Sequence, residues 1–318
     1  MLELRAAVIG AGRMGRERAR AAKSMGAEIK VICDPDIDRA ESLAADMEAL
    51  AVTSTADLDL SCLDVLFVCT PPALRGEIES EAIAAGTALF VEKPIGLDVE
   101  QCLHLLDALE KRPVINATGY MNRYRDSVLT ARRRVEAACP IGLAFQWFAA
   151  QYRVPWWLDR SQSGGPINEQ CTHYIDLCRF LCGEISEVQA TGRRLTDAPD
   201  AEGTVAMTLQ FENGLIGSGL YSCEASLKQM AFEIFLSDGS VRLEGWDLRA
   251  KNEARPEDIF LKEVAAFFDA VRMRDPSKIQ SDIRSALKTQ SVVDAIRRAL
   301  ASGGRERVFD LQEMLLSR

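Results

Sequence analysis

The first 120 residues alternate short apolar runs with longer amphipathic stretches. Five apolar runs have the composition of strands that are buried on both faces: RAAVIG, IKVICD, DVLFVCT, ALFVEK and VINATG. Between them, apolar residues recur at helical spacing in four places: near 14–25, 37–49, 73–85 and 98–110. Strands that alternate with helices in this way predict a doubly wound parallel sheet over residues 1–120.

The pattern changes over residues 121–318. Five longer stretches alternate apolar and polar positions as strands do: LAFQWFAAQY, EVQATGRRL, GTVAMTLQF, LIGSGLYSC and MAFEIFLS. Asn213-Gly214 and Asp238-Gly239 are good hairpin dipeptides. Further helices are expected near 124–138, 257–273 and 282–301. This part is therefore predicted to be an α+β domain with a large open, mostly antiparallel sheet and helices on one side.

Composition limits the classes of function. The chain has 318 residues, of which 47% are hydrophobic, and its formal net charge is −9. A nucleic-acid-binding surface needs a basic excess, so we expect no nucleic-acid partner. We expect no membrane partner either, because no apolar run approaches about 18 residues and the N-terminus lacks a signal-peptide layout. The nine cysteines show no paired or metal-ligand spacing, which favours reduced thiols in a cytoplasmic protein without a metal site.

A glycine-rich turn follows the first strand. In VIGAGRMGRERA, Gly10 permits a tight turn, Gly12 lets a pyrophosphate approach the backbone, and Gly15 lets helix and strand pack closely. Asp34 ends the second strand 19 residues after Gly15, where a carboxylate can bind the ribose hydroxyls of NAD. The alternative is a tight turn followed by an ordinary aspartate, but the context on both sides favours dinucleotide binding.

The same region sets the expected cofactor. Arg13 and Met14 lie between the glycines and are included in the predicted cofactor site. The carboxylates of Asp34 and Asp36 favour a ribose diol and repel a 2′-phosphate, although Arg39 offsets part of that repulsion. We therefore expect NAD(H) to be preferred, with NADP(H) as the alternative.

Two further strand ends lie at the edge where such sheets bind ligands. The run CTPPALR places Thr70, Pro71 and Pro72 after one strand, and the prolines keep the chain extended across that edge. The run FVEKPIG places Glu92 and Lys93 after the next strand. An ammonium group at this edge can donate a hydrogen bond to a substrate oxygen. A surface lysine before a turn is the alternative.

One of the two histidines lies in a helix expected over 165–183. Glu169 stands four residues before His173, and Asp176 stands three residues after it, so the three side chains share one face. Glu169 can then orient His173 and favour its charged form. The stripe is either a proton-transfer unit or a solvated helix face, and the helix alone leaves both open. His104, the other histidine, is expected to be structural.

Five motifs together resemble one family. In order along the chain they are GAGRMG, VCTPP, VEKP, GYMNRY and SGGPINEQCTHYIDLCRFLCGE. Their order and spacing are similar to those of the glucose–fructose oxidoreductase, inositol 2-dehydrogenase and rhizopine-catabolism family (Gfo/Idh/MocA), over nearly the whole chain. The resemblance implies a Rossmann domain for NAD or NADP, and a second domain with an open sheet for association and part of the substrate pocket. It matches Lys93 to the family's EKP lysine, and Glu169 and His173 to its acid and histidine.

The resemblance implies a nicotinamide-dependent oxidoreductase. Its expected substrate is a secondary alcohol, or the corresponding ketone, of a sugar, a polyol or a related cyclic compound. In this hypothesis Lys93 and His173 handle the hydroxyl proton, and Glu169 orients His173. Two alternatives stay open: a lyase or glycosidase of the same family that recycles its cofactor, and a non-catalytic sensor that binds a dinucleotide and a partner.

The chain departs from the family pattern at three positions. Glu169 stands where aspartate is usual, Arg75 where a histidine often follows the proline pair, and Asn122 where polyol dehydrogenases often carry arginine. The first departure bears on the catalytic base, and the other two bear on the substrate. The residues expected to line the substrate pocket, with core packing as the alternative for the two tryptophans, are Tyr120, Met121, Asn122, Trp156 and Trp157.

The second sheet also predicts association. Its strands over 203–245 carry many apolar residues, and helices on one side leave the other face to be covered. We therefore expect a homodimer or homotetramer that is joined through this open sheet.

Overall fold

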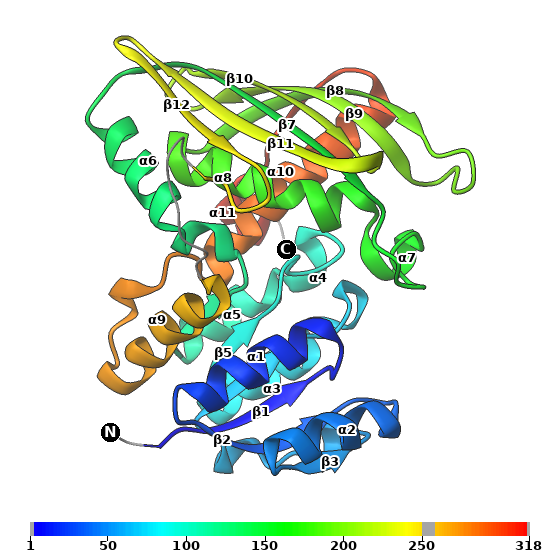
Figure 1. The fold of residues 1–318 in the computed structure, drawn as a ribbon, viewed down its shortest axis with the longest axis vertical. Coiled ribbons are helices and arrows are strands. Elements are labelled where there is room, and N and C mark those ends of the chain that lie inside the picture. Colours follow the sequence, from blue (N-terminus) through cyan, green and yellow to red (C-terminus); the bar gives the residue numbers. More distant parts are fainter. Residues whose placement is uncertain (1–2, 250–257, 317–318) are drawn as a thin grey trace. The chain divides into compact units, whose positions relative to one another are not determined.

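The computed structural model describes residues 3–249 and 258–316 (Figure 1). The chain forms two compact units. Unit 1 comprises Met1–Gly96, Glu100–Met121 and Asp258–Ala286, and unit 2 comprises Leu97–Val99, Asn122–Glu257 and Leu287–Arg318. A helix from late in the chain, α9 (Ile259–Met273), therefore folds with the N-terminal part.

Unit 1 is built on a six-stranded parallel sheet in the order β3-β2-β1-β4-β5-β6, which confirms the predicted doubly wound fold. Its strands are β1 (Arg5–Ile9), β2 (Glu28–Cys33), β3 (Leu50–Val52), β4 (Val65–Val68), β5 (Ala88–Val91) and β6 (Asn116–Thr118). The sequence did not predict β3, because its three residues are too few for a periodic signal and none is fully buried.

Helices cover the sheet of unit 1. Besides α9, they are α1 (Arg13–Ser24), α2 (Ile37–Met47), α3 (Glu77–Ala85) and α5 (His104–Lys111). Asp36 sets the start of α2, since its side chain accepts a hydrogen bond from the backbone N–H of Arg39. Four aromatic rings of the core join α9 to the central strands, and they belong to Phe67, Phe90, Phe267 and Phe268.

Unit 2 is built on a seven-stranded mixed sheet in the order β12-β11-β7-β10-β9-β8-β13. Its strands are β7 (Pro140–Ala150), β8 (Ile185–Arg194), β9 (Glu202–Phe211), β10 (Ile216–Ser222), β11 (Glu224–Leu236), β12 (Gly239–Glu244) and β13 (Arg305–Arg307). Among the described strand pairs of this sheet, only β7–β10 is parallel, so the predicted open and mostly antiparallel sheet is confirmed. Antiparallel hairpins form at Asn213-Gly214 and at Asp238-Gly239.

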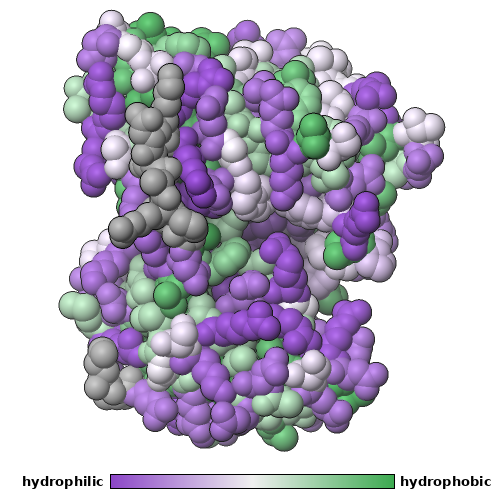
Figure 2. Space-filling model, viewed as in Figure 1, coloured by the Kyte–Doolittle hydropathy of each residue, from purple (hydrophilic) through white to green (hydrophobic). Residues whose placement is uncertain are grey.

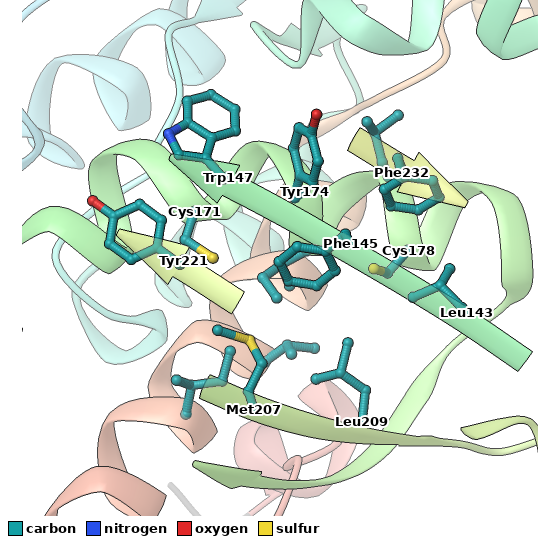
Figure 3. Close-up of a cluster of buried hydrophobic side chains, with 14 of the residues drawn as sticks. Leu143, Phe145, Trp147, Cys171, Tyr174, Cys178, Met207, Leu209, Tyr221 and Phe232 are labelled. Atoms are coloured by element: carbon teal, nitrogen blue, oxygen red, sulfur yellow. The ribbon is translucent and has the colours of Figure 1, made fainter. Parts of the chain in front are cut away.

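The helices of unit 2 lie on one side of its sheet (Figure 1). They are α6 (Asp126–Glu136), α7 (Arg160–Ser163), α8 (Thr172–Cys182) and α11 (Leu311–Leu316). Two more helices, α4 (Val99–Cys102) and α10 (Ile283–Ser302), contain residues of both units. Figure 3 shows part of the core of unit 2, where side chains of β7, β9, β10 and β11 meet those of α8. In the described part of the chain, no helix covers the opposite face of the sheet.

The face of unit 1 seen in Figure 2 is mostly polar. Figure 2 shows hydrophilic side chains over most of the visible part that carries α1 and α2, with isolated apolar residues between them. Within 3–249 and 258–316, none of the helices is both long enough and apolar enough to cross a membrane.

Candidate functional site

The glycine turn forms a cradle at the start of α1. Gly10 has a φ of +92°, and a Cβ there would lie 2.8 Å from the carbonyl oxygen of Cys69. A Cβ at Gly15 would overlap the carbonyl oxygen of Gly10, so neither position accepts a side chain. Gly12 is the N-cap residue of α1, and the space beside it is open. The N-terminus of α1 therefore fits the pyrophosphate of a dinucleotide.

The carboxylate of Asp34 is fixed beside this turn. Its Oδ2 accepts a hydrogen bond from the N–H of Ala11 at 2.8 Å, and its Oδ1 accepts one from the N–H of Asp36 at 3.0 Å. A carboxylate has about four acceptor positions, so two remain for the hydroxyl groups of a ribose. Arg13 is exposed and Met14 half-buried at the start of α1, next to the glycines.

The ends of β4 and β5 bring the next predicted residues together. Val68 pairs with Val91, so the segments that follow these two residues start side by side. Thr70, Pro71 and Lys93 are half-buried in these segments, whereas Pro72 and Glu92 are buried. This is the arrangement that a lysine at the ligand-binding edge of the sheet requires.

The carboxylate of Glu92 has a partner in the core that the sequence did not reveal. Arg18 contacts Glu92 at 2.6 Å and Glu263 at 2.6 Å, and its guanidinium lies over the rings of Phe90 and Phe260. Burial acts to lower the pKa of Arg18, but Glu263 and Glu92 outweigh it and raise the pKa. Arg18 therefore stays charged and ties α1, the end of β5 and α9 together. Periodicity gave no signal for Arg18, since an arginine in an amphipathic helix normally marks the exposed face.

The helix of His173 starts differently from the regular α-helix that we expected. A π-turn occupies Ile167–Cys171, in which the N–H of Thr172 reaches the carbonyl oxygen of Ile167, and α8 continues from it to Cys182, with Gly183 as the C-cap residue. Such turns occur often at functional sites. They cannot be seen in the sequence, because a single extra residue in one turn hardly changes the helical periodicity.

The polar stripe of this helix is buried. Glu169 and His173 are each 4% exposed, and Asp176 is 1% exposed. A solvated helix face is therefore wrong for these residues. Buried ionisable side chains need partners, and such groups are often functional. That Glu169 orients His173 stays a prediction.

Asp176 belongs to a buried ion pair. Arg123 binds it through two hydrogen bonds, Nε to Oδ2 at 2.7 Å and one terminal nitrogen to Oδ1 at 2.6 Å. The hydroxyl group of Thr289 donates to the same carboxylate at 2.9 Å. Arg123 links α8 to the short turn before α6, and Thr289 links it to α10. The contacts of Asp176 are therefore structural. Sequence alone missed Arg123 and Thr289, because they lie 53 and 113 residues from Asp176.

The imidazole of His173 stacks on one ring of an aromatic cluster. The indole of Trp147, on β7, lies within 6° of parallel to the imidazole, with the ring centres 6.1 Å apart. Tyr174 and Trp246 meet the same indole edge-on, at 5.1 and 5.8 Å. Burial raises the pKa of Tyr174, so its phenol stays neutral. Figure 3 shows Trp147 beside Tyr174 in this cluster.

The predicted substrate-pocket residues divide between the two units. Tyr120 and Met121 are buried in unit 1, whereas Asn122 is buried in unit 2, where its Oδ1 accepts a hydrogen bond from Nε of Arg125 at 2.9 Å. The two tryptophans belong to unit 2. Trp157 is fully buried within its core, and Trp156 is half-buried at the margin of that core. Core packing therefore accounts for Trp157.

The described residues contain neither a metal-ligand cluster nor a disulfide. No group of three or more histidine, cysteine, aspartate or glutamate side chains there could hold a metal ion. The nine cysteines, all of which are described, form no disulfide. Burial raises the pKa of Cys171 and Cys178, so these thiols stay protonated and act as small apolar side chains of the core.

Comparison with known families agrees with this geometry. A family model described as "Oxidoreductase family, NAD-binding Rossmann fold" matches residues 4–120, and the model "GFO/IDH/MocA C-terminal domain" matches residues 141–242. The chain therefore belongs to the Gfo/Idh/MocA oxidoreductase family. Its N-terminal part is the NAD-binding Rossmann domain of that family, as the motifs predicted.

Three relatives of different activity match the chain. The scyllo-inositol 2-dehydrogenase (NAD(+)) of Bacillus subtilis is 28% identical, over 68% of this chain and 66% of the relative. The 2,7-anhydro-N-acetylneuraminate hydratase of Escherichia coli is 29% identical, over 66% and 59% of the two chains. The UDP-N-acetylglucosamine 3-dehydrogenase of Acidithiobacillus ferrooxidans is 27% identical, over 69% and 66%. The chain thus spans a little less than two thirds of the length of these relatives.

Solved structures share the whole fold. The structure of GenD2 from gentamicin A biosynthesis in complex with NAD has a TM-score of 0.87 at 22% identity and covers 98% of this chain and 97% of its own. Levoglucosan dehydrogenase in complex with NADH has a TM-score of 0.84 at 20% identity and covers 97% and 100% of the two chains. At this identity the similarity establishes the fold, and the function has to be argued from the site.

Proposed function

We propose that this protein is an NAD(H)-dependent oxidoreductase that acts on CH–OH groups of a sugar, a polyol or a related cyclic compound. The observation that carries the proposal is the edge of the sheet in unit 1. There the open glycine turn and the fixed carboxylate of Asp34 fit a dinucleotide, and the adjoining strand end presents Lys93. The relatives that are named dehydrogenases of inositol and UDP-N-acetylglucosamine support this class of substrate. We place the protein in the cytoplasm.

In the proposed mechanism, the hydride of the CH–OH group is handled by the cofactor and its hydroxyl proton by side chains of the protein. The glycine turn and Asp34 would hold the dinucleotide, whose nicotinamide would supply a hydride acceptor for the carbinol carbon in oxidation and a hydride donor in reduction. Lys93 donates a hydrogen bond to the reacting oxygen, His173 takes the hydroxyl proton, and Glu169 stabilises the resulting imidazolium. In the reductive direction the same groups protonate the alkoxide. The ion pair of Asp176 and Arg123 contributes by fixing the helix of His173.

A panel of compounds tests this proposal. The protein is mixed with NAD⁺ and with inositols, aldoses and sugar nucleotides in turn, and the absorbance of reduced nicotinamide is followed. The proposal predicts net, substrate-dependent formation of NADH for at least one of these classes. Bound cofactor with no redox change for any compound, in either direction, would instead favour a sensor.

The recycling alternative has one specific observation in its favour, which is the similarity to 2,7-anhydro-N-acetylneuraminate hydratase. An enzyme of that kind would convert its substrate with no net change in the reduced-nicotinamide band. Product analysis of the same mixtures by mass spectrometry separates the two, because only the dehydrogenase forms NADH and product in equal amounts.

We expect Asp34 to select NAD(H) over NADP(H) by about 1–3 kcal/mol in binding free energy. Its carboxylate is fixed beside the glycine turn, and Arg39, which could attract a 2′-phosphate, pairs with Asp36 at 3.0 Å. Asp34→Asn should narrow the preference, and fluorescence titration with NADH and NADPH measures it. Equal dissociation constants in the wild type would contradict this role of Asp34.

We propose a homodimer or homotetramer through the open sheet of unit 2. Ile216, Leu220 and Phe235 alternate with the helix-facing residues of their strands, and 39–50% of each is exposed on the face that no described helix covers. Leu220→Glu should shift the protein toward the 35.1 kDa monomer in sedimentation at micromolar concentration, whereas Met273→Glu in unit 1 should not. A wild type that sediments only as the monomer would refute this association.

A further inference from the structure

Arg75 joins the two strand ends of the cofactor edge. Its guanidinium donates to the carbonyl oxygen of Glu92 at 2.8 Å, to that of Val68 at 3.2 Å, and twice to that of Thr70. The residue is 6% exposed, so these bonds are shielded from water. The planar guanidinium, with its five N–H donors, thus binds three carbonyl groups. Val68 is the last residue of β4, Thr70 follows β4, and Glu92 follows β5.

The contacts of Arg75 lie next to functional candidates. Thr70 precedes the proline pair at the end of β4, and Glu92 precedes Lys93 at the end of β5. Backbone carbonyl groups beyond the ends of parallel strands have lost their ladder partners and need other donors. Arg75 supplies donors to the carbonyl groups of Thr70 and Glu92, and it adds a second donor to that of Val68, which also accepts from the N–H of Glu92 at 2.9 Å. It therefore couples the position of one segment to that of the other.

Two further side chains, Gln101 and Arg18, also bind these two segments. The side-chain amide of Gln101 donates to the carbonyl oxygens of Pro72, Ala73 and Arg75 at 2.9, 3.3 and 3.1 Å. Arg18 holds the carboxylate of Glu92, while Arg75 holds its carbonyl oxygen. The side chain and the backbone of Glu92 are thus each fixed by a different buried arginine. The result is a preorganised edge, which lowers the ordering cost of a ligand that binds there.

We propose that Arg75 is a positioning residue for the nicotinamide half of the cofactor. In a sheet of this strand order, the pyrophosphate lies over the turn after β1, with one mononucleotide half toward β2 and the other toward β4 and β5. Asp34 is on the β2 side and Arg75 on the β4–β5 side. The inference rests on the cofactor of the proposed function but not on its substrate.

Binding of two ligands to the full-length protein tests the inference without turnover. NADH contains both halves, whereas ADP-ribose lacks the nicotinamide ring. Arg75→Gln should weaken NADH about tenfold and change ADP-ribose by less than about twofold, because the buried carbonyl groups lose their donors only on the nicotinamide side. Asp34→Asn should weaken both ligands by the same factor. Isothermal titration calorimetry gives all of these dissociation constants.

The matched control is Arg112→Gln. Arg112 also donates to backbone carbonyl groups in unit 1, those of Ala84 and Ala85 at the end of α3, but this site precedes β5 rather than following it. Arg112→Gln should therefore leave the dissociation constants of NADH and ADP-ribose unchanged. Arg75→Lys retains the charge and part of the bonding, so it should restore most of the NADH affinity that Arg75→Gln loses.

The ratio of the two dissociation constants decides the matter. An Arg75→Gln protein that binds NADH as the wild type does, or that loses NADH and ADP-ribose equally, would overturn the inference. If Arg75→Gln fails to fold, the same ratio in Arg75→Lys decides, because its expected loss is smaller but confined to NADH. A failure of the substrate panel would refute the proposed function and leave this ratio intact.

Discussion

Replacement of His173 by alanine is expected to lower kcat by about 10²–10⁴-fold while the affinity for NADH stays nearly unchanged. The reason is that His173 is assigned to the hydroxyl proton, whose transfer matters in the transition state, whereas the dinucleotide is assigned to the glycine turn of unit 1. Steady-state kinetics on any active substrate, together with NADH titration, separates the two quantities. Lys93→Ala should reduce kcat to a similar extent.

His104→Ala is the control for the change from histidine to alanine. His104 is half-buried at the start of α5, with its Nε2 3.3 Å from the carbonyl oxygen of Gly76, so its loss should affect stability more than turnover. Near-wild-type kcat in both histidine variants would contradict the assignment of His173, and Lys93 or Tyr120 would then have to carry the proton.

Glu169→Gln should reduce kcat less than His173→Ala does, because an amide oxygen still accepts a hydrogen bond from an imidazole. It should nevertheless move the limb of the pH–rate profile that belongs to His173 to lower pH. The imidazolium form loses a negative neighbour in this variant, so His173 gives up its proton more readily. An unchanged profile would show that Glu169 does not act on His173.

Removal of the Asp176 carboxylate is expected to lower the free energy of unfolding by about 3–5 kcal/mol. Asp176→Ala takes the bidentate partner from Arg123, whose side chain is 5% exposed, and an acceptor from Thr289. Loss of the carboxylate partner costs far more free energy for a buried guanidinium than for one exposed to water, because the buried charge is left uncompensated. Urea denaturation followed by circular dichroism measures the loss.

Glu136→Ala is the matched control for a broken ion pair. Glu136 binds Arg132 at 2.9 Å, but their side chains are 59% and 41% exposed. Exposed pairs contribute less than about 1 kcal/mol, so this variant should remain close to the wild type. A similar small loss in both variants would contradict the structural role of the Arg123–Asp176 pair.

Much of the fold could be predicted from the sequence, because both sheets have strong local signals. Continuous apolar runs marked the buried strands of unit 1, and alternation marked those of unit 2. Glycine spacing located the cofactor turn. By contrast, β3 is too short for such a signal, and nothing local indicated that α9 would fold with unit 1.

The candidate site was only partly predictable. Lys93 and the glycines could be placed at the ends of strands, since both motifs directly follow apolar strand runs. Arg18 and Arg75 could not, because their buried carboxylate and carbonyl partners come from other segments of the chain. The π-turn before α8 and the indole of Trp147 beside His173 likewise depend on tertiary packing.

Transfer of deuterium from a labelled cofactor tests the central claim most directly. The protein is incubated with NADH that carries deuterium at both C4 positions of the nicotinamide and with keto forms of inositols and sugars, and the products are analysed by mass spectrometry. Hydride transfer to a carbonyl carbon predicts an alcohol that carries the deuterium, formed together with an equal amount of NAD⁺ and formed about 10²–10⁴-fold more slowly by His173→Ala. Binding of NADH with no deuterated alcohol from any of these ketones would contradict the account.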